Sequence, residues 1–272
     1  NTLRLTGVPS GQDGNMYRVN VSGICAPPVR SNEVTMTVRE RPEILAQPGD
    51  TTVCEGIQAE FSVDAGVTDS PAFQWQVNMN DGNGFLDIGT DSAGIYSGFD
   101  QPVLQVLNPA SRFNGYQYRV ILTGACTPVL TSSTATLTVR ELPEIVTEPV
   151  PKVICEEQNT FFSVNAGVTT NAQYQWQVDM GSGFVDIGAD TGVYSGTGTS
   201  NLFLTLVPST HNGYIYQVVV SGACTPEVNS ADVLLTVNEI PEITGEPVSD
   251  TVCEGDPAIF AVNAGVTTGV AY

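Results

Sequence analysis

Six cysteines are the residues of this chain best suited to chemistry, because a thiol can bind a metal ion or form a disulfide. They are Cys25, Cys54, Cys126, Cys155, Cys224 and Cys253, in a chain of 272 residues. Structural zinc sites use cysteines that lie close together in the sequence, often with histidine. Here no two cysteines are closer than 29 positions and the chain has a single histidine. The spacing therefore favours disulfides, which place the protein outside a reducing cytosol.

Other groups offer little for catalysis. The histidine, His211, lies before Asn212-Gly213-Tyr214, and its counterpart in a second copy of this segment is Phe113. We therefore expect an exposed residue in a turn. The sequence contains no nucleophile elbow, no phosphate-binding loop and no His-Glu-x-x-His motif. We predict that the chain is not an enzyme, and we assign no catalytic residue and no cofactor.

Calcium is the strongest ligand hypothesis. One stretch resembles an oxygen-rich cation loop through Asn78, Asn80, Asp81, Asn83 and Asp87. The equivalent stretch from Asp179 to Gly183 has lost most of these oxygens, so a plain hairpin turn is the better interpretation. Glu141 and Glu144 flank Pro143 in a short connector. They are weak calcium candidates, and solvated charge is again the better interpretation.

The composition limits the classes of partner that the chain can bind. The chain has 29 acidic and 9 basic residues, which gives a formal net charge of −20. This charge excludes a nucleic-acid partner, because proteins neutralise phosphates with clustered Lys and Arg. Hydrophobic residues make up 41% and charged residues 14%, so apolar material suffices for a core. The sequence contains no run of about 18 apolar residues, so we predict no membrane-spanning helix.

Internal repeats decide the organisation of the chain. Pro-Glu-Ile begins at Pro42, Pro143 and Pro241, at intervals of 101 and 98 residues. Cys-Glu recurs at the same intervals, and Ala-Gly-Val-Thr and Gly-Ala-Cys-Thr-Pro recur in step with them. A unit of this length matches an independent small domain. We predict complete domains at 41–140 and 141–238, the C-terminal part of a domain at 1–40 and the N-terminal part of another at 239–272.

Within each repeat the apolar residues alternate with polar ones. This period of two appears in Phe73-Gln74-Trp75-Gln76-Val77 and in Tyr116-Gln117-Tyr118-Arg119-Val120, and turn residues such as Asn114-Gly115 separate the segments. The pattern is typical of β-strands. About seven short strands in each repeat predict an all-β fold, an antiparallel β-sandwich.

Each repeat resembles an immunoglobulin-like domain. Trp75 follows Val63 by 12 positions, as the core tryptophan of that family follows its second strand, and Asn114-Gly115-Tyr116 resembles the tyrosine corner. The core signature residues are Trp75, Trp176, Tyr116 and Tyr214. Val63 and Tyr118 occupy the places of the family's inter-sheet cysteines. The resemblance implies that Cys54, before the second strand, pairs with Cys126, after the sixth.

By the same comparison Cys155 pairs with Cys224, while Cys25 and Cys253 pair outside the segment. The combined motifs are more specific than the fold. They resemble the tandem immunoglobulin-like repeats of very large Bacteroidota surface proteins, including gliding-motility adhesins. The resemblance implies export across the outer membrane by the type IX route. It also suggests O-glycosylation at Asp-Ser/Thr-apolar sites, for which Thr51, Ser92 (in Asp91-Ser92-Ala93) and Thr251 are candidates, although ordinary polar turns are the better interpretation of such short motifs.

These observations predict a structural or adhesive repeat region, a stalk or fibre on the cell surface that contacts neighbouring immunoglobulin-like domains. The sequence does not decide whether it assembles into filaments. One alternative is a module that binds surface glycans, fibre subunits or another protein, with Tyr96 and Tyr194 as aromatics for sugar stacking. Packing is the preferred interpretation of both tyrosines. Another alternative is a spacer within a secreted multidomain enzyme.

Overall fold

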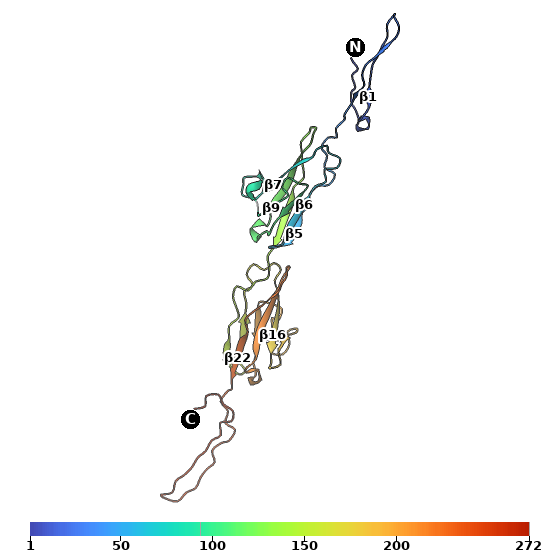
Figure 1. Ribbon diagram of the computed structural model, residues 1–272. Coiled ribbons are helices and arrows are strands. Elements are labelled where there is room, and N and C mark those ends of the chain that lie inside the picture. Colours follow the sequence, from blue (N-terminus) through green and yellow to red (C-terminus); the bar gives the residue numbers. More distant parts are fainter. Residues whose placement is uncertain (93, 272) are drawn as a thin grey trace. The chain divides into compact units, whose positions relative to one another are not determined.

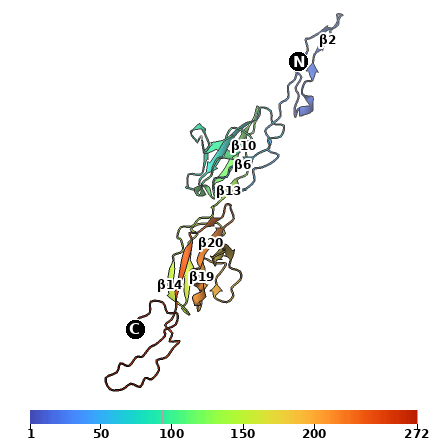
Figure 2. The same ribbon diagram turned by 60° about the horizontal axis from the view of Figure 1, so that its bottom comes forward.

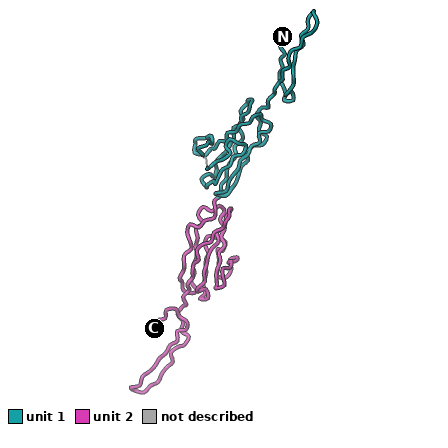
Figure 3. Tube along the Cα trace, in the orientation of Figure 1, with its two compact units in different colours: residues 1–140 teal, residues 141–272 magenta. Residues whose placement is uncertain are grey.

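The computed structural model describes residues 1–92 and 94–271, and the chain forms two compact units, residues 1–140 and 141–272 (Figure 3). Both units are built from β-strands, as the alternating sequence predicts. The helices of the described residues are single turns: η1 (Ser10–Gln12), η2 (Thr90–Ser92), η3 (Ser111–Phe113) and η4 (Ser209–His211). The prediction of an all-β fold is confirmed.

The first unit contains a sandwich of two sheets (Figures 1 and 2). Its strands are β5 (Thr51–Cys54), β6 (Ala59–Ser62), β7 (Ala72–Asn78), β8 (Phe85–Asp87), β9 (Tyr96–Ser97), β10 (Val103–Val106), β11 (Gln117–Thr123), β12 (Leu130–Thr131) and β13 (Ala135–Arg140). The larger sheet has the order β5-β13-β11-β7-β8, with β12 also paired to β11, and the smaller sheet has the order β6-β10-β9.

The second unit repeats this plan. Its strands are β14 (Lys152–Cys155), β15 (Thr160–Ser163), β16 (Gln173–Asp179), β17 (Phe184–Asp186), β18 (Tyr194–Ser195), β19 (Asn201–Leu204), β20 (Ile215–Ser221), β21 (Val228–Asn229) and β22 (Val233–Asn238). The sheet orders are β14-β22-β20-β16-β17, with β21 on β20, and β15-β19-β18. The same motifs therefore build the same sandwich twice.

One pair of strands in each sandwich is parallel, which alternation alone did not predict. β5 runs parallel to β13, with Leu137 opposite Thr51 and Arg140 opposite Cys54. β14 pairs with β22 in the same way, with Cys155 opposite Asn238. Parallel strands require a long crossover, and here the rest of the domain provides it. The first and last strands of a repeat therefore end at the same end of the sandwich.

The core lies between the two sheets. Along β11 the buried side chains are Tyr118, Val120 and Leu122, and the residues between them are only partly buried. Trp75 is fully buried with them, and the Phe61 ring stacks on Tyr118 with 4.7 Å between centroids. Each large apolar side chain that is fully buried contributes about 1.5–3 kcal/mol. The second sandwich buries Trp176, Phe162 and Tyr216 at the matching positions.

The segments outside the two sandwiches have little secondary structure of their own. Residues 1–40 form two short pairs, β1 (Met16–Tyr17) with β4 (Val34–Thr35) and β2 (Asn20–Val21) with β3 (Val29–Arg30). In the described part of 239–272, one isolated bridge joins Gly245 and Asn263. It is equivalent to the bridges Ala46–Asp64 and Thr147–Asn165 of the complete repeats. That both segments are parts of further domains stays a prediction.

Candidate functional site

Three of the repeated motifs come together at one end of each complete repeat. In the first repeat the end is formed by Pro42–Glu43, Gly66–Thr68 and Gly124–Cys126, which are linked by hydrogen bonds and close packing. We call this the linker end, because Pro42 and Glu43 lead into the domain. The linker end of the second repeat consists of Pro143–Glu144, Gly167–Thr169 and Gly222–Cys224.

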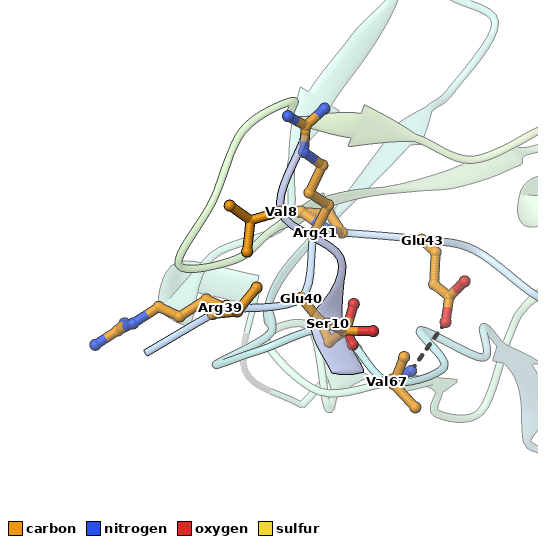
Figure 4. Close-up of a pocket in the computed structure, with 9 residues that line it drawn as sticks. Val8, Ser10, Arg39, Glu40, Arg41, Glu43 and Val67 are labelled. Atoms are coloured by element: carbon orange, nitrogen blue, oxygen red, sulfur yellow. Dashed lines mark hydrogen bonds between the residues drawn. The ribbon is translucent and has the colours of Figure 1, made fainter. Parts of the chain in front are cut away.

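A carboxylate fixes the turn at the linker end. The Val67 amide donates to Oε1 of Glu43 at 3.0 Å, as Figure 4 shows, and the Glu43 amide donates to Oγ1 of Thr68 at 3.1 Å. The Thr68 hydroxyl in turn donates to the carbonyl of Ala65 at 2.5 Å. Each backbone donor thereby gains a partner that a turn alone would not supply.

The second repeat contains both glutamate contacts, and the segment after 238 contains one of them. In the second repeat, Val168 donates to Glu144 at 3.1 Å and Glu144 donates to Thr169 at 3.0 Å. In the segment after 238, the Glu242 amide donates to Thr267 at 3.4 Å. Recurrence of Pro-Glu-Ile in step with Ala-Gly-Val-Thr is the sequence signal from which this contact could have been found.

The glycine of this turn has no room for a side chain. Gly66 has φ +54° and Gly167 has φ +56°, in the left-handed region that favours glycine. A Cβ at Gly66 would collide with Oε1 of Glu43, and one at Gly167 would collide with Oε1 of Glu144. The repeated Ala-Gly-Val-Thr motif therefore requires glycine for two separate reasons.

A second glycine holds the cysteine loop against the linker. A Cβ at Gly124 would lie 2.9 Å from Cγ2 of Thr68 and 3.2 Å from Cγ of Pro42. The next residue, Ala125, donates its amide to the carbonyl of Asp69 at 2.9 Å. In the second repeat, Ala223 donates to Thr170 at 2.8 Å. The loop that contains Cys126 or Cys224 is thus fixed in place next to the linker.

A shallow depression of about 310 Å³ lies beside the linker of the first repeat (Figure 4). Val8, Ser10, Val67 and the segment 38–43 line it. Nε of Arg39 lies 3.8 Å from Oδ2 of Asp69, with both side chains well exposed. An exposed pair of this kind contributes little to stability. The depression has a mixed lining without a converging set of polar groups, and it suggests no small-molecule site.

The cysteine pairing that the resemblance implied is wrong. Cys54 and Cys224 are disulfide-bonded, whereas Cys126, Cys155, Cys25 and Cys253 have free thiols. Neither Cys54–Cys126 nor Cys155–Cys224 is therefore formed. That Cys25 and Cys253 pair with residues outside the segment stays a prediction.

The physical reason is that the two cysteines of a repeat lie at opposite ends of its sandwich. Cys54 ends β5 opposite Arg140, beyond the start of β11, because Gln117 pairs with Thr136. Cys126 follows the other end of β11, whose seven residues span about 23 Å. A disulfide requires Cα atoms within about 7 Å. The pairing within one repeat is therefore geometrically excluded.

The tryptophans of the core signature lie where the resemblance implied. Both are fully buried, and each indole satisfies its N–H on a backbone carbonyl. Nε1 of Trp75 donates to Gln101 at 2.9 Å, and Nε1 of Trp176 donates to Thr199 at 2.9 Å. Both tryptophans thereby belong to the core of their sandwich.

The tyrosines divide into two kinds. Tyr116 and Tyr214 are only partly buried, and the Tyr116 ring lies 5.0 Å from that of Phe113. Tyr118, in the place of a family cysteine, is fully buried, and its hydroxyl lies 3.3 Å from the hydroxyl of Tyr96. The second repeat has the same pair in Tyr194 and Tyr216, at 3.1 Å. Tyr96 and Tyr194 therefore pack into their domains, which is the interpretation that we preferred to sugar stacking.

His211 is not the exposed turn residue that we expected. It ends η4, is only partly exposed, and packs its ring 4.8 Å from Tyr214 and 5.9 Å from Tyr194. Its counterpart Phe113 is buried in the first repeat. The imidazole therefore fills an aromatic position, and burial lowers the pKa of His211.

The calcium candidates take part in hydrogen bonds of their own repeat. The Glu144 carboxylate accepts from Val168, and the Glu141 amide donates to Thr170. The β7–β8 connection is a hairpin in which Asp81 accepts from the amide of Asn83, a contact that lowers the pKa of Asp81. Asp179 accepts from three amides, with Gly181 the main cause of its lowered pKa. Among the described residues, no cluster of His, Cys, Asp and Glu could hold a metal ion.

The three glycosylation candidates differ in accessibility. Thr251 is exposed, whereas Thr51 lies in β5 and donates its hydroxyl to the carbonyl of Glu60 at 3.1 Å. Ser92 ends η2 and is partly buried, and Ala93 of its motif lies outside the described residues. Modification at these sites stays a prediction. No helix in the described part of the chain is long and apolar enough to cross a bilayer.

No protein-family model and no curated protein matches this sequence. Solved structures of tandem immunoglobulin domains match its fold. An I-band fragment of titin has TM-score 0.59 and 16% identity, covering 77% of this chain and 70% of that chain. DIP-gamma IG1+IG2 has TM-score 0.52 and 15% identity, covering 73% and 98%. Rst D1-D2 has TM-score 0.52 and 15% identity, covering 73% and 100%. At this identity the likeness shows the fold alone: the chain consists of tandem immunoglobulin-like domains.

Proposed function

We propose that this chain is a structural or adhesive repeat region, part of the stalk or fibre of a very large extracellular surface protein. The observation that supports this most directly is the recurrence of the linker end. A hydrogen bond from the glutamate amide to the threonine hydroxyl forms at all three Pro-Glu-Ile connections, and the glutamate carboxylate also accepts from the turn in both complete repeats. Because this contact recurs at each connection between repeats, we infer that its role is to fix the connection.

The motifs extend the proposal to a source and a route. They resemble repeats of Bacteroidota surface proteins such as gliding-motility adhesins, so we place the chain on the cell surface after type IX export across the outer membrane. Oxidised cysteines support a location outside the cytosol. The formal net charge of −20 suits a solvated shaft whose neighbours repel one another.

Labelling of intact cells tests the location. An antibody against residues 41–238 should label unpermeabilised cells, and external protease should remove the signal. Labelling only after permeabilisation would contradict the proposal. An in-frame deletion of residues 41–238 should reduce adhesion or gliding while the protein is still exported.

The alternatives give different results in the same experiments. A binding module would retain specific glycans on an array or capture a defined surface protein, and the isolated chain would do so without the rest of the protein. A spacer in a secreted enzyme would leave adhesion unchanged on deletion and would alter an extracellular enzymatic activity.

A further inference from the structure

The carbonyl that ends the last strand of a repeat lies next to the cysteine of the first strand. In the first repeat, Cys54 is opposite Arg140, and the amide of Glu55 donates to the Arg140 carbonyl at 2.8 Å. In the second repeat, Cys155 is opposite Asn238, and the amide of Glu156 donates to the Asn238 carbonyl at 2.9 Å. We call Cys54 and Cys155 strand cysteines and Cys126 and Cys224 loop cysteines.

A third carbonyl of this kind is contacted by a loop cysteine. Arg39 precedes Arg140 by 101 positions, the length of one repeat. The thiol of Cys126 donates to the carbonyl oxygen of Arg39, with 3.8 Å between Sγ and the oxygen. The packing of Gly124 on Pro42 and the Ala125–Asp69 hydrogen bond hold Cys126 there. A loop cysteine thus lies where the strand cysteine of the preceding repeat would end.

Geometry then favours a bond between repeats over a bond within one. Adjacent strands are about 4.8 Å apart, so a strand cysteine opposite Arg39 would come within reach of Cys126. Disulfides join Cα atoms about 4.4–6.8 Å apart. Within one repeat, the two cysteines lie at opposite ends of β11.

We propose that the strand cysteine of each repeat forms a disulfide with the loop cysteine of the repeat that follows. This chain contains both members of such a pair once, Cys54 and Cys224, and these are its disulfide-bonded cysteines. Cys126 accordingly takes the strand cysteine of a preceding repeat, and Cys155 takes the loop cysteine of a following one. The connectivity follows from repeat geometry and holds whatever function the repeats have.

The oxidation needs a disulfide as oxidant, either a small molecule or a thiol–disulfide oxidoreductase. The thiolate of one cysteine attacks the oxidant and forms a mixed disulfide, and the second cysteine displaces the remaining thiol. One S–S bond forms in the protein and one breaks in the oxidant. The electron pair and both protons leave with the two thiol groups to which the oxidant's disulfide is reduced.

Tryptic mapping of this chain tests the pairing. The chain is refolded with oxidised and reduced glutathione, the monomer is isolated, and free thiols are alkylated before digestion. Trypsin places Cys54 in 40–112 and Cys126 in 120–140, since Arg41 precedes proline. Fragment 153–272 contains Cys224 together with Cys155 and Cys253. We expect a reducible link between 40–112 and 153–272, and four alkylated thiols. A link between 40–112 and 120–140, with two alkylated thiols, would overturn the proposal.

Matched variants separate pairing from folding. Cys54→Ser should abolish the link, and Cys126→Ser should leave it intact, although both remove one cysteine from the same repeat. Cys224→Ser and Cys155→Ser form the corresponding pair in the second repeat. A link that survives Cys224→Ser, or one found only in disulfide-linked dimers, would contradict the assignment, because fragment 153–272 also contains Cys155 and Cys253.

Discussion

At the scale of single residues, aromatic positions decide how each core is completed. Tyr118 and Tyr216 occupy positions where the immunoglobulin family has inter-sheet cysteines, and each uses its buried hydroxyl to reach a second tyrosine. The link between sheets is thus a hydrogen bond between side chains instead of a covalent bond.

A double-mutant cycle measures this hydrogen bond. Tyr96→Phe and Tyr118→Phe should each destabilise the first repeat by about 1–2 kcal/mol, because each leaves a buried hydroxyl without its partner. The double variant should cost less than the sum, with a coupling of about 0.5–1 kcal/mol. Urea unfolding gives the three values, and strict additivity would contradict the role assigned to the pair.

His211 should make the second repeat sensitive to acid. Burial lowers its pKa in the folded state, so the unfolded chain binds the proton more readily and stability falls as pH drops below about 6.5. His211→Phe, which copies Phe113, should lose less melting temperature than wild type between about pH 7.5 and pH 5.5.

The reciprocal change provides the control. Phe113→His should introduce the same acid sensitivity into the first repeat, which lacks histidine. Equal losses in melting temperature for wild type and His211→Phe would show that carboxylates elsewhere dominate the acid response.

At the scale of elements, the linker end depends on a turn that only glycine permits. Gly167→Ala should cost about 1–2 kcal/mol for the left-handed backbone and about 1–3 kcal/mol more for the collision with Glu144. Gly192 has φ +60° and open space around it, so Gly192→Ala should show the backbone cost alone. Urea midpoints compare the two variants, and equal losses would mean that the Glu144 contact is readily given up.

Much of this architecture could be predicted from the sequence. The alternating segments around Phe61, Trp75, Leu104 and Tyr118 correspond to β6, β7, β10 and β11, because a half-buried strand must alternate. The parallel pairing of β5 was missed, since Thr51–Cys54 shows no clear alternation and its register depends on residues far away in the chain. The disulfide was also misassigned, because cysteine spacing does not determine connectivity.

The partners of the glutamates show the same limit. Glu144 was considered as a cation ligand because two carboxylates flank Pro143. Its actual partner is the amide of Val168, 24 positions away. Composition near the linker could not reveal this contact, whereas the co-recurrence of two motifs in every repeat could have.

At the scale of the whole molecule, pulling the chain by its two ends should distinguish the possible cysteine pairings. With reductant, each complete repeat should unfold and release at most about 35 nm of chain. Without reductant, a Cys54–Cys224 bond should keep the residues between the two cysteines from extending. Reductant added afterwards should break this single bond and release about 60 nm of chain in one step. Two separate, shorter releases on reduction would indicate bonds within repeats instead. Force spectroscopy of the monomer makes the measurement.

The placement of the two cysteines at opposite ends of one sandwich has a consequence for a longer array. Bonds within repeats would close separate loops, and the chain from 127 to 154 would lie in none of them. A loop from Cys54 to Cys224 overlaps the next one, which begins at Cys155, so every stretch of the array would be spanned by at least one covalent bond. In such an array the disulfide bonds would carry the tension, and a domain could unfold without lengthening the fibre.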